Sequence, residues 1–383
     1  MHSQLASLTA IPDHHTYGPQ PDRMVLRGWF TQSNTITRGI LKNLQSGQES
    51  VPQRDILNPP LWEFGHLTWF HEFWVQRKGQ EARPSLLADA DYLFNSSDIA
   101  HADRWKITLP ELSTLLDYNQ RVVNQTLTLL NHSLSPEDTY FIQLAIFHQD
   151  MHNEAFAYMW QTLGYARPFE PYSKKNCLTS ASNSYIDFSE SVFLAGSQTN
   201  TGFLFDNEKW QHPIHLNPFS ISSHAVSNAD YLEFVKAGVL GSEMPAHWKC
   251  EGGCWYQRTF NEWIELDMLG SLRHISYQDA LRYCDWRGVR LPTEHEMTFM
   301  MSQDIQKWQS SDVWEWTSSA FLPFPGFSTD PYVDYSQPWF DGTYQVLKGW
   351  SAYTPERLRR PALRNFYQPH RSDHFCGFRT CLL

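Results

Sequence analysis

The first half of the chain repeats apolar residues with the period of an α-helix. A first helix is predicted over 22–46, where the apolar positions at roughly helical spacing are Leu26, Trp29, Phe30, Ile36 and Ile40. A second is predicted from just after Pro59 and Pro60 to about Lys78, because proline favours the first turn of a helix. The third covers 109–132, and the fourth covers 140–163, a stretch without Pro or Gly. Four helices with one long connection predict a helical bundle over residues 22–165.

The pattern changes after Gly164. Residues 166–188 contain Pro, Ser and Asn with little periodicity, so they are predicted to form a linker. From 189 onward, short apolar runs such as 191–194 and 212–216 alternate with turn residues, which is typical of irregular strands. Two amphipathic stretches, 228–237 and 276–287, predict helices. The sequence therefore predicts a two-domain α+β protein, in which a helical bundle precedes an α+β domain over 189–383.

Two histidines on the fourth predicted helix have metal-ligand spacing. His148 and His152 are four residues apart, so a helix places both imidazoles on one face, one above the other. Helices that offer two nitrogen ligands to a divalent metal use this spacing. Glu154 lies about 200° round the helix from His152 and is better placed as a brace than as a ligand. Histidines that only pack also occur at this spacing, so a metal site requires a third ligand from elsewhere.

His66 is the predicted third ligand. It falls within the wide apolar face of the second helix, whose other members are Leu61, Phe64, Leu67, Trp69, Phe70, Phe73 and Trp74. A buried imidazole needs partners for its nitrogens, which core packing alone does not supply. We therefore expect His66 to join His148 and His152, with His71 as the weaker competitor.

Length and charge limit the classes of partner. A chain of 383 residues is long enough for two domains. Its formal net charge of −11 disfavours nucleic acid and an anionic membrane surface, and no apolar run approaches a membrane span. Residues 1–21 lack the charged start and apolar run of a signal peptide, which favours a cytoplasmic location. The aromatic share of 15% is high, and aromatic rings line pockets for flat or cationic ligands.

Motifs of the second half resemble the formylglycine-generating-enzyme-like domain. They follow the family's order, in the segments 226–231, 275–280, 283–286, 290–296, 313–317, 347–351, 364–365 and 377–380. Residues 290–294 read RLPTE and residues 313–317 read VWEWT, as in that family. The resemblance implies a C-type-lectin-like α+β fold for residues 189–383.

The first half resembles the DinB-like four-helix domain that precedes this module in ergothioneine-type enzymes. Their H-x3-H-x-E motif corresponds to His148, His152 and Glu154, and their earlier histidine corresponds to His66. Together the halves resemble the non-haem iron sulfoxide synthases, which use O2 to join a thiol to the imidazole ring of hercynine. The resemblance implies Fe(II) held by the three histidines, with open positions for O2 and substrates. Neutral imidazoles suit this metal.

Departures from the motifs indicate a branch of this family. In enzymes that use γ-glutamylcysteine, an arginine pair after the first ligand helix holds the substrate carboxylates, whereas the equivalent loop here, 94–105, has only Arg104. Those enzymes also carry an Asp four residues before a C-terminal Arg, whereas Tyr367 stands here four residues before Arg371. A zwitterionic dipeptide would lose a bidentate partner and a counter-charge.

A sugar suits the residues that replace them, because its hydroxyls form hydrogen bonds while its apolar face stacks on a ring. The loop segment 101–105, His-Ala-Asp-Arg-Trp, also resembles the selenoneine synthases, which use hercynine and the selenosugar 1-seleno-glucose. We therefore place the sequence in the selenoneine synthase branch. Arg104, Tyr367 and Arg371 are predicted to contact the co-substrate.

The resemblance also predicts contacts with hercynine, a trimethylammonium betaine. Asn365 and Phe366 would lie against it, with Phe366 offering a π face to the cation. Met151 stands where the family often has Gln, and its side chain can pack against the methyl groups. Core packing is the alternative for Phe366 and Met151. A tyrosine near the iron donates a proton in this family. The segment 325–335 offers Tyr332 and Tyr335, of which Tyr332 is the predicted residue, with a surface-loop role as the alternative.

Three functions are therefore carried forward. The first is an Fe(II)- and O2-dependent synthase that forms a C–Se bond between hercynine and a selenosugar. The second is the same chemistry with a sulfur donor, γ-glutamylcysteine or cysteine. The third is a non-catalytic lectin-like binding module with a helical appendage.

Overall fold

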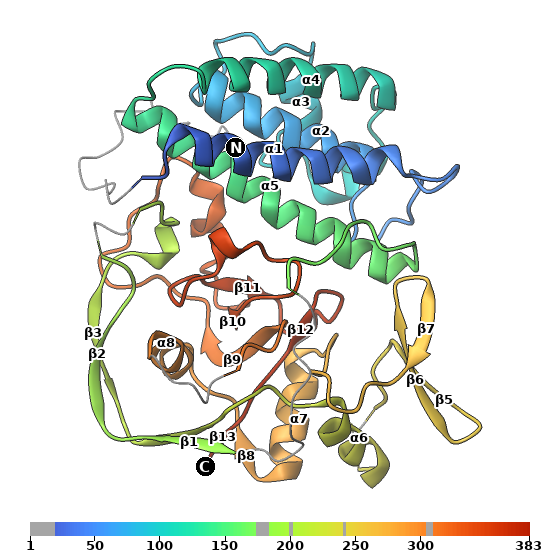
Figure 1. Cartoon of the computed structure of the whole chain (residues 1–383), viewed down its shortest axis with the longest axis vertical. Coiled ribbons are helices and arrows are strands. Elements are labelled where there is room, and N and C mark those ends of the chain that lie inside the picture. Colours follow the sequence, from blue (N-terminus) through green and yellow to red (C-terminus); the bar gives the residue numbers. More distant parts are fainter. Residues whose placement is uncertain (1–19, 174–183, 199–201, 240–242, 304–308) are drawn as a thin grey trace. The chain divides into compact units, whose positions relative to one another are not determined.

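The computed structural model describes residues 20–173, 184–198, 202–239, 243–303 and 309–383 (Figure 1). Within these ranges the chain forms two compact units. The first contains residues 20–156, Gly202, Phe203 and Asp330–Asp334, and the second contains the other described residues. Residues 1–19, on which the prediction about a signal peptide rests, lie outside the described residues. So do residues 174–183 of the predicted linker. No described helix is both long and apolar enough to cross a membrane.

Helices build the first unit, and they occupy the four predicted stretches with shifted ends. The bounds are α1 Arg23–Lys42, α2 Pro60–His71, α3 Ala90–Phe94, α4 Leu112–Leu129 and α5 Pro136–Leu163. A π-helical turn, Glu72–Gln76, continues α2, and a 3-10 turn, His101–Trp105, follows α3. The Asp22 side chain caps α1 by accepting hydrogen bonds from two backbone N–H groups of the first turn. From Ala157, the last turns of α5 belong to the second unit.

Buried polar side chains fix the helices of the first unit against one another. The Asn153 side chain of α5 accepts from the Thr37 hydroxyl at 2.7 Å and donates to the Ser33 carbonyl at 3.1 Å, which ties α5 to α1. The Asn119 amide of α4 donates to the Thr68 hydroxyl of α2 at 3.1 Å. Because these buried hydrogen bonds form only when the helices are in one relative position, they fix the rotation and the axial position of α2 and α5.

The second unit is an α+β structure of short strands. The bounds are β1 Tyr185–Phe188, β2 Ser191–Ala195, β3 His212–Leu216, β4 Phe219–Ser222, β5 Trp248–Glu251, β6 Cys254–Thr259, β7 Glu262–Glu265, β8 Val289–Arg290, β9 Trp314–Ala320, β10 Gln345–Gly349, β11 Asn365–Tyr367, β12 Cys376–Gly377 and β13 Cys381–Leu382. They form sheets in the orders β1-β4-β13-β8, β11-β10-β9-β12, β2-β3 and β5-β6-β7. β1 lies at the end of the predicted linker, where it pairs antiparallel with β4.

Three described helices complete the second unit, namely α6 Asn228–Ala237, α7 Tyr277–Arg287 and α8 Glu294–Ser302. Each begins with a capping box. The side chain of a Ser or Thr accepts from the backbone N–H three residues on, and the acidic side chain at that later position accepts from the backbone N–H of the Ser or Thr. α6 and α7 are the two predicted helices of this part. α8 was not predicted, although Thr293 of the RLPTE segment and Glu296, two residues after that segment, carry its start signal.

Candidate functional site

Three imidazoles meet inside the first unit. His66 lies on α2, and His148 and His152 lie on α5. The ring centroids of His66 are 5.2 Å from those of His148 and 5.3 Å from those of His152, and the α5 pair is 4.3 Å apart. One nitrogen from each ring lies within 4.8 Å of the others. The structure thus brings together the three residues that the sequence predicted as ligands.

The outer nitrogens of two of these rings are fixed by hydrogen bonds. His66 Nδ1 lies 2.8 Å from the carbonyl oxygen of Phe94, the last residue of α3. His152 Nδ1 bonds the carboxylate of Glu63, which stands one turn before His66 on α2. These bonds leave Nε2 of both rings for the centre of the cluster. A ligand imidazole is oriented in this way at many protein metal sites.

A glycine permits the contact between His66 and α3. A Cβ on Gly65 would lie only 2.1 Å from the Phe94 ring, so no larger residue fits without moving that ring. The Trp62 indole covers His66 from the other side, stacked at 5.1 Å with an interplanar angle of 6°. The position of His66 is therefore set by packing as well as by its hydrogen bond.

Burial keeps two of the three imidazoles, those of His66 and His148, neutral. Burial lowers the pKa of His66 to about 3, assisted by the proximity of His152. Burial likewise lowers the pKa of His148 well below its ordinary value. Burial alone would raise the pKa of Glu63, but His152, His66 and Arg104 reverse this and hold it below its ordinary value. Near neutral pH, His66 and His148 thus offer unprotonated imidazole nitrogens beside an ionised carboxylate.

The donor set fits a divalent transition metal. The Nε2 atoms of His148 and His152 are 3.1 Å apart. Neighbouring nitrogen ligands at roughly 2.1 Å from one metal are separated by about this distance. Three imidazoles without a protein carboxylate in the set suit iron, zinc or copper and leave coordination positions for other molecules. The residues present could therefore hold a metal ion.

Aromatic residues wall one side of the cluster. Phe70 of α2 stacks on His148, with ring centroids 3.6 Å apart and an interplanar angle of 7°. Tyr332 meets Phe70 edge-on at 4.9 Å, and its ring lies 6.0 Å from that of His148. A hydrogen bond between the Ser97 hydroxyl and Asp334 anchors the segment that carries Tyr332. Burial raises the pKa of Tyr332, so its phenol stays protonated at neutral pH.

Arg104 belongs to the same neighbourhood. Its guanidinium lies 4.0 Å from the centre of the Trp62 ring and donates to the Asn58 side chain at 2.7 Å. Burial lowers the pKa of Arg104, while Glu63 and Tyr332 act against this change. Arg104 therefore supplies a buried positive charge near the cluster. Met151 is half-buried on α5, next to His152 in sequence.

The remaining predicted residues lie in the second unit, on β11 and the segment after it. Phe366 stacks on Phe321 with centroids 3.9 Å apart, and the Asn365 side chain accepts from the Phe366 backbone N–H at 2.9 Å. Arg371 forms a two-bonded ion pair with Asp373, whose second bond is 2.6 Å long. This carboxylate raises the pKa of Arg371 against the effect of burial. The fork of Arg371 is thus already held by the protein.

Sequence reasoning missed two residues around the cluster. Glu63 contacts His152 through its carboxylate, whereas the sequence had offered only Glu154 as a brace, and Phe94 accepts the bond from His66. Glu63 precedes His66 by three residues, a helical spacing that places both on one side of α2, and this signal was available. His71, the competing histidine, instead lies 2.9 Å from the Thr126 hydroxyl and is not a member of the cluster.

Sequence comparisons relate the chain to characterised proteins. The sulfatase-modifying factor enzyme 1-like domain matches residues 179–312. Hercynine oxygenase of Mycolicibacterium smegmatis is 26% identical over 395 residues, covering 85% of this chain and 91% of that protein. Hercynine oxygenase of Mycobacterium tuberculosis is 25% identical, with the same shares covered. Ergothioneine biosynthesis protein 1 of Schizosaccharomyces pombe is 30% identical over 199 residues, covering 43% of this chain and 26% of that protein.

These similarities support a relationship with the hercynine oxygenases and ergothioneine biosynthesis proteins, and therefore an oxidative enzyme. The matched domain, together with the mixed helices and sheets of the structure, fits a two-domain α+β fold.

Proposed function

We propose that the chain is an iron(II)- and O2-dependent selenoneine synthase that joins 1-seleno-glucose to the imidazole C2 of hercynine. The observation that carries the proposal is the cluster of His66, His148 and His152, which brings one nitrogen from each ring close enough to bind one metal ion. In the reaction, the hydrogens of the C–H and Se–H bonds leave with one oxygen atom of O2 as water. The other oxygen atom remains on selenium.

The first unit contributes defined groups to this chemistry. Iron(II), when bound, would supply the activation of O2. Glu63 orients His152 and the Phe94 carbonyl orients His66, so that both present Nε2. Tyr332, kept protonated by burial beside His148, is proposed to donate a proton during O2 reduction. Phe70 and Trp62 exclude water from two of the imidazoles.

A sugar is proposed as the co-substrate because the second unit does not offer the two charged partners that a zwitterionic dipeptide needs. Arg371 is occupied by Asp373, and the acid that would meet an ammonium group is replaced by Tyr367. Tyr367 packs edge-on against His374, with centroids 3.9 Å apart. A zwitterionic dipeptide would therefore meet neither a vacant guanidinium fork at Arg371 nor a carboxylate at 367, whereas a sugar needs neither. Arg104, held by Asn58, is proposed to donate to sugar hydroxyls.

Hercynine as the acceptor is supported by the names of the relatives, two of which are hercynine oxygenases. Phe366 is covered by Phe321 on one face, so its other face is the one proposed to meet the trimethylammonium group. Asn365 and Met151 are proposed to contact the same substrate.

A sulfur donor is the second candidate. The relatives are named for hercynine oxygenation and ergothioneine biosynthesis, and these names favour C–S bond formation with γ-glutamylcysteine or cysteine. The two candidates share the metal and the acceptor. They differ in the donor that would meet Arg104 and the segment from Tyr367 to Arg371.

Parallel turnover assays test the proposal. Protein loaded with Fe(II) without oxygen is given hercynine, O2 and one donor, namely 1-seleno-glucose, γ-glutamylcysteine or cysteine, and products are measured by mass spectrometry. We expect kcat/KM for 1-seleno-glucose to exceed that for the dipeptide at least tenfold, and Tyr367→Asp to narrow this ratio. A preference for the dipeptide would overturn the donor assignment. If the protein binds a full equivalent of iron but hercynine reacts with none of the three donors, the proposal is overturned altogether.

A further inference from the structure

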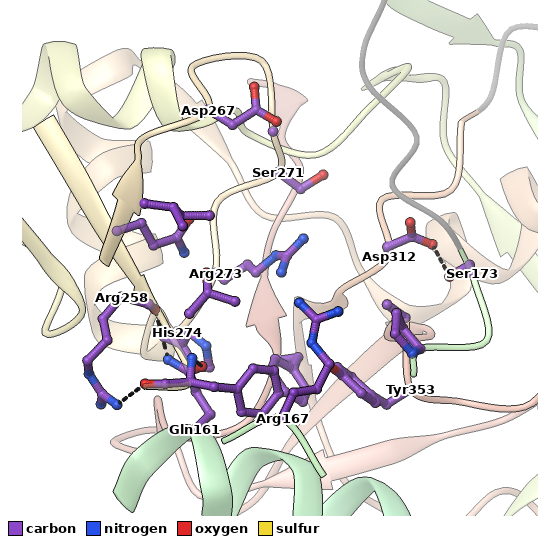
Figure 2. Close-up of a pocket in the computed structure, with 18 of the residues that line it drawn as sticks. Gln161, Arg167, Ser173, Arg258, Asp267, Ser271, Arg273, His274, Asp312 and Tyr353 are labelled. Carbon is purple, nitrogen blue, oxygen red and sulfur yellow. Dashed lines mark hydrogen bonds between the residues drawn. The ribbon is translucent and has the colours of Figure 1, made fainter. Parts of the chain in front are cut away.

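A cavity lies wholly inside the second unit. It has a volume of about 350 Å³ and is lined by the end of α5, the loop after it, β6 and the loops that carry Arg273, Asp312 and Tyr353 (Figure 2). This volume is at the lower end of those that hold small organic molecules. None of the residues assigned to the proposed reaction lines it.

Two guanidinium groups converge on this cavity. Figure 2 shows the side chains of Arg167 and Arg273 turned into the same space from different segments. Arg273 forms no hydrogen bond or ion pair with any residue that the structure describes. Burial lowers the pKa of Arg273. Tyr353, Asp312 and Asp267 act against this change, and Arg167 adds to it. Arg167 contacts Glu170, an exposed carboxylate that also lines the cavity, at 3.5 Å. Two like charges facing one space repel each other, and a bound anion would remove that repulsion.

The other charged groups of the wall are committed elsewhere. Arg258 donates to the Phe260 carbonyl at 2.8 Å and to His247 at 2.9 Å. Asp312 accepts from the Ser173 hydroxyl at 2.8 Å. The cavity therefore presents guanidinium N–H donors that the protein itself does not use. Such forks match the planar geometry of a carboxylate.

Aromatic rings form another part of the wall, and the Arg167 guanidinium lies 5.6 Å from the centre of the Phe260 ring. Tyr353 stacks on Phe375 with centroids 4.9 Å apart, and Phe260 meets Tyr353 edge-on at 6.1 Å. A ligand that places a carboxylate between the arginines would therefore lay an apolar or aromatic body against these rings. Inorganic anions would leave this part of the cavity unfilled.

The backbone of the cavity is held in an uncommon conformation. Phe260, His274 and Asp312 have φ values of 57°, 61° and 55°, which place non-glycine residues in the left-handed region. They are three of the five such residues in the described chain, and all three line this cavity. Strained residues of this kind gather at ligand sites, where the surrounding structure maintains them.

We propose that the second unit binds a small organic carboxylate between Arg167 and Arg273, with its apolar body against Phe260, Tyr353 and Phe375. The site is separate from the histidine cluster in its residues and its chemistry. It does not depend on the identity of the metal or the co-substrate proposed above.

Calorimetric titration of the full chain with four matched probes tests this site. Phenylacetate carries both charge and ring, acetate only the charge, phenylacetamide only the ring, and inorganic phosphate a different anion. We expect phenylacetate to bind at least tenfold more tightly than acetate and phenylacetamide to give no measurable binding. Phosphate binding more tightly than phenylacetate would overturn the ligand class. Absence of binding by all four probes at 10 mM would overturn the site.

Variants locate the binding. Arg273→Met is expected to lower the affinity for phenylacetate at least tenfold, and Arg273→Lys is expected to lower it less. Arg282→Met, which changes an exposed arginine of α7, should leave the affinity unchanged. Unchanged affinity in Arg273→Met would contradict the proposal. If that variant fails to fold, as judged by circular dichroism, Arg167→Met provides the same test at a more exposed position. His148→Ala is expected to leave phenylacetate binding unchanged, which separates this site from the metal chemistry.

Discussion

Buried polar groups are treated in opposite ways in two regions of the molecule. In the second unit, the guanidinium groups of Arg364 and Arg379 each pair with a buried carboxylate, Glu294 and Glu315, and also donate to backbone carbonyls. In the first unit, His66, His148 and His152 turn ring nitrogens toward one another. The paired groups have complete hydrogen bonding, whereas the imidazole cluster is completed only by a ligand. This difference separates residues that hold a fold from residues that form a site.

The largest effect is expected from breaking one of the completed pairs. Glu315→Ala leaves the Arg379 guanidinium buried without its counter-charge, which costs about 3–5 kcal/mol of unfolding free energy. Glu233→Ala, which removes the exposed contact with Arg287, should cost less than about 1 kcal/mol. Urea unfolding followed by circular dichroism measures both. Equal losses in the two variants would show that burial of the pair does not determine its importance.

Gly65→Ala tests the packing that positions His66. The new Cβ would collide with the Phe94 ring, so we expect a loss of about 1–3 kcal/mol in unfolding free energy together with weaker metal binding. Gly39→Ala on α1 meets no neighbour and should stabilise the helix by about 0.5–1 kcal/mol. Thermal and urea unfolding compare the two. A neutral Gly65→Ala would mean that α3 does not constrain His66.

Glu63→Gln tests the orientation of His152 without removing a ligand. Loss of the charged acceptor should weaken metal binding about 10–100-fold. The control is Glu72→Gln, because Glu72 is equally buried but contacts Ser85, Leu86 and Tyr118 instead of a ligand. Competition for Fe(II) with a chromophoric chelator gives both affinities. The same loss in both variants would point to a general effect of buried charge.

The metal-free protein should lose stability in acid. The pKa values of His66 and His71 are about 3 when folded, against an ordinary value of 6.5, so the unfolded chain binds more protons between these limits. Stability is therefore complete above pH 6.5 and falls as the pH decreases toward 3, by about 1.4 kcal/mol per pH unit for each histidine. Urea unfolding at pH 7, 6, 5 and 4 measures this slope. His71→Gln should reduce it, and an unchanged slope would contradict the burial argument for that residue.

The ligand-bearing helices could be predicted because the relevant information is local. The spacing of His148 and His152 fixes their common face on any helix, and Pro60 marks the start of the helix that carries His66. The contact between Glu63 and His152 depends on how two helices align, and no periodicity within either helix encodes that alignment. The same reason applies to Tyr332, whose segment is distant in sequence from α5 and packs against it through side-chain contacts.

The second unit was less predictable, because loops build most of it. α8 could have been found from the Thr293 and Glu296 capping box, but its short apolar run resembles a strand. The cavity beside Arg273 could not be found, because its arginines come from separate irregular segments and no motif links them. Arg371 and Asp373 are only two residues apart in the sequence, but only the structure shows that their side chains form an ion pair.

The most direct measurement of the central claim is an iron titration of the metal-free protein under anaerobic conditions. The account predicts one tightly held Fe(II) per chain in the unmodified protein and in His71→Ala. It predicts less than a tenth of that occupancy in His66→Ala, His148→Ala and His152→Ala, each of which should remain folded by circular dichroism. Full iron occupancy in His66→Ala or His148→Ala would contradict the three-histidine site and the oxidative chemistry that rests on it.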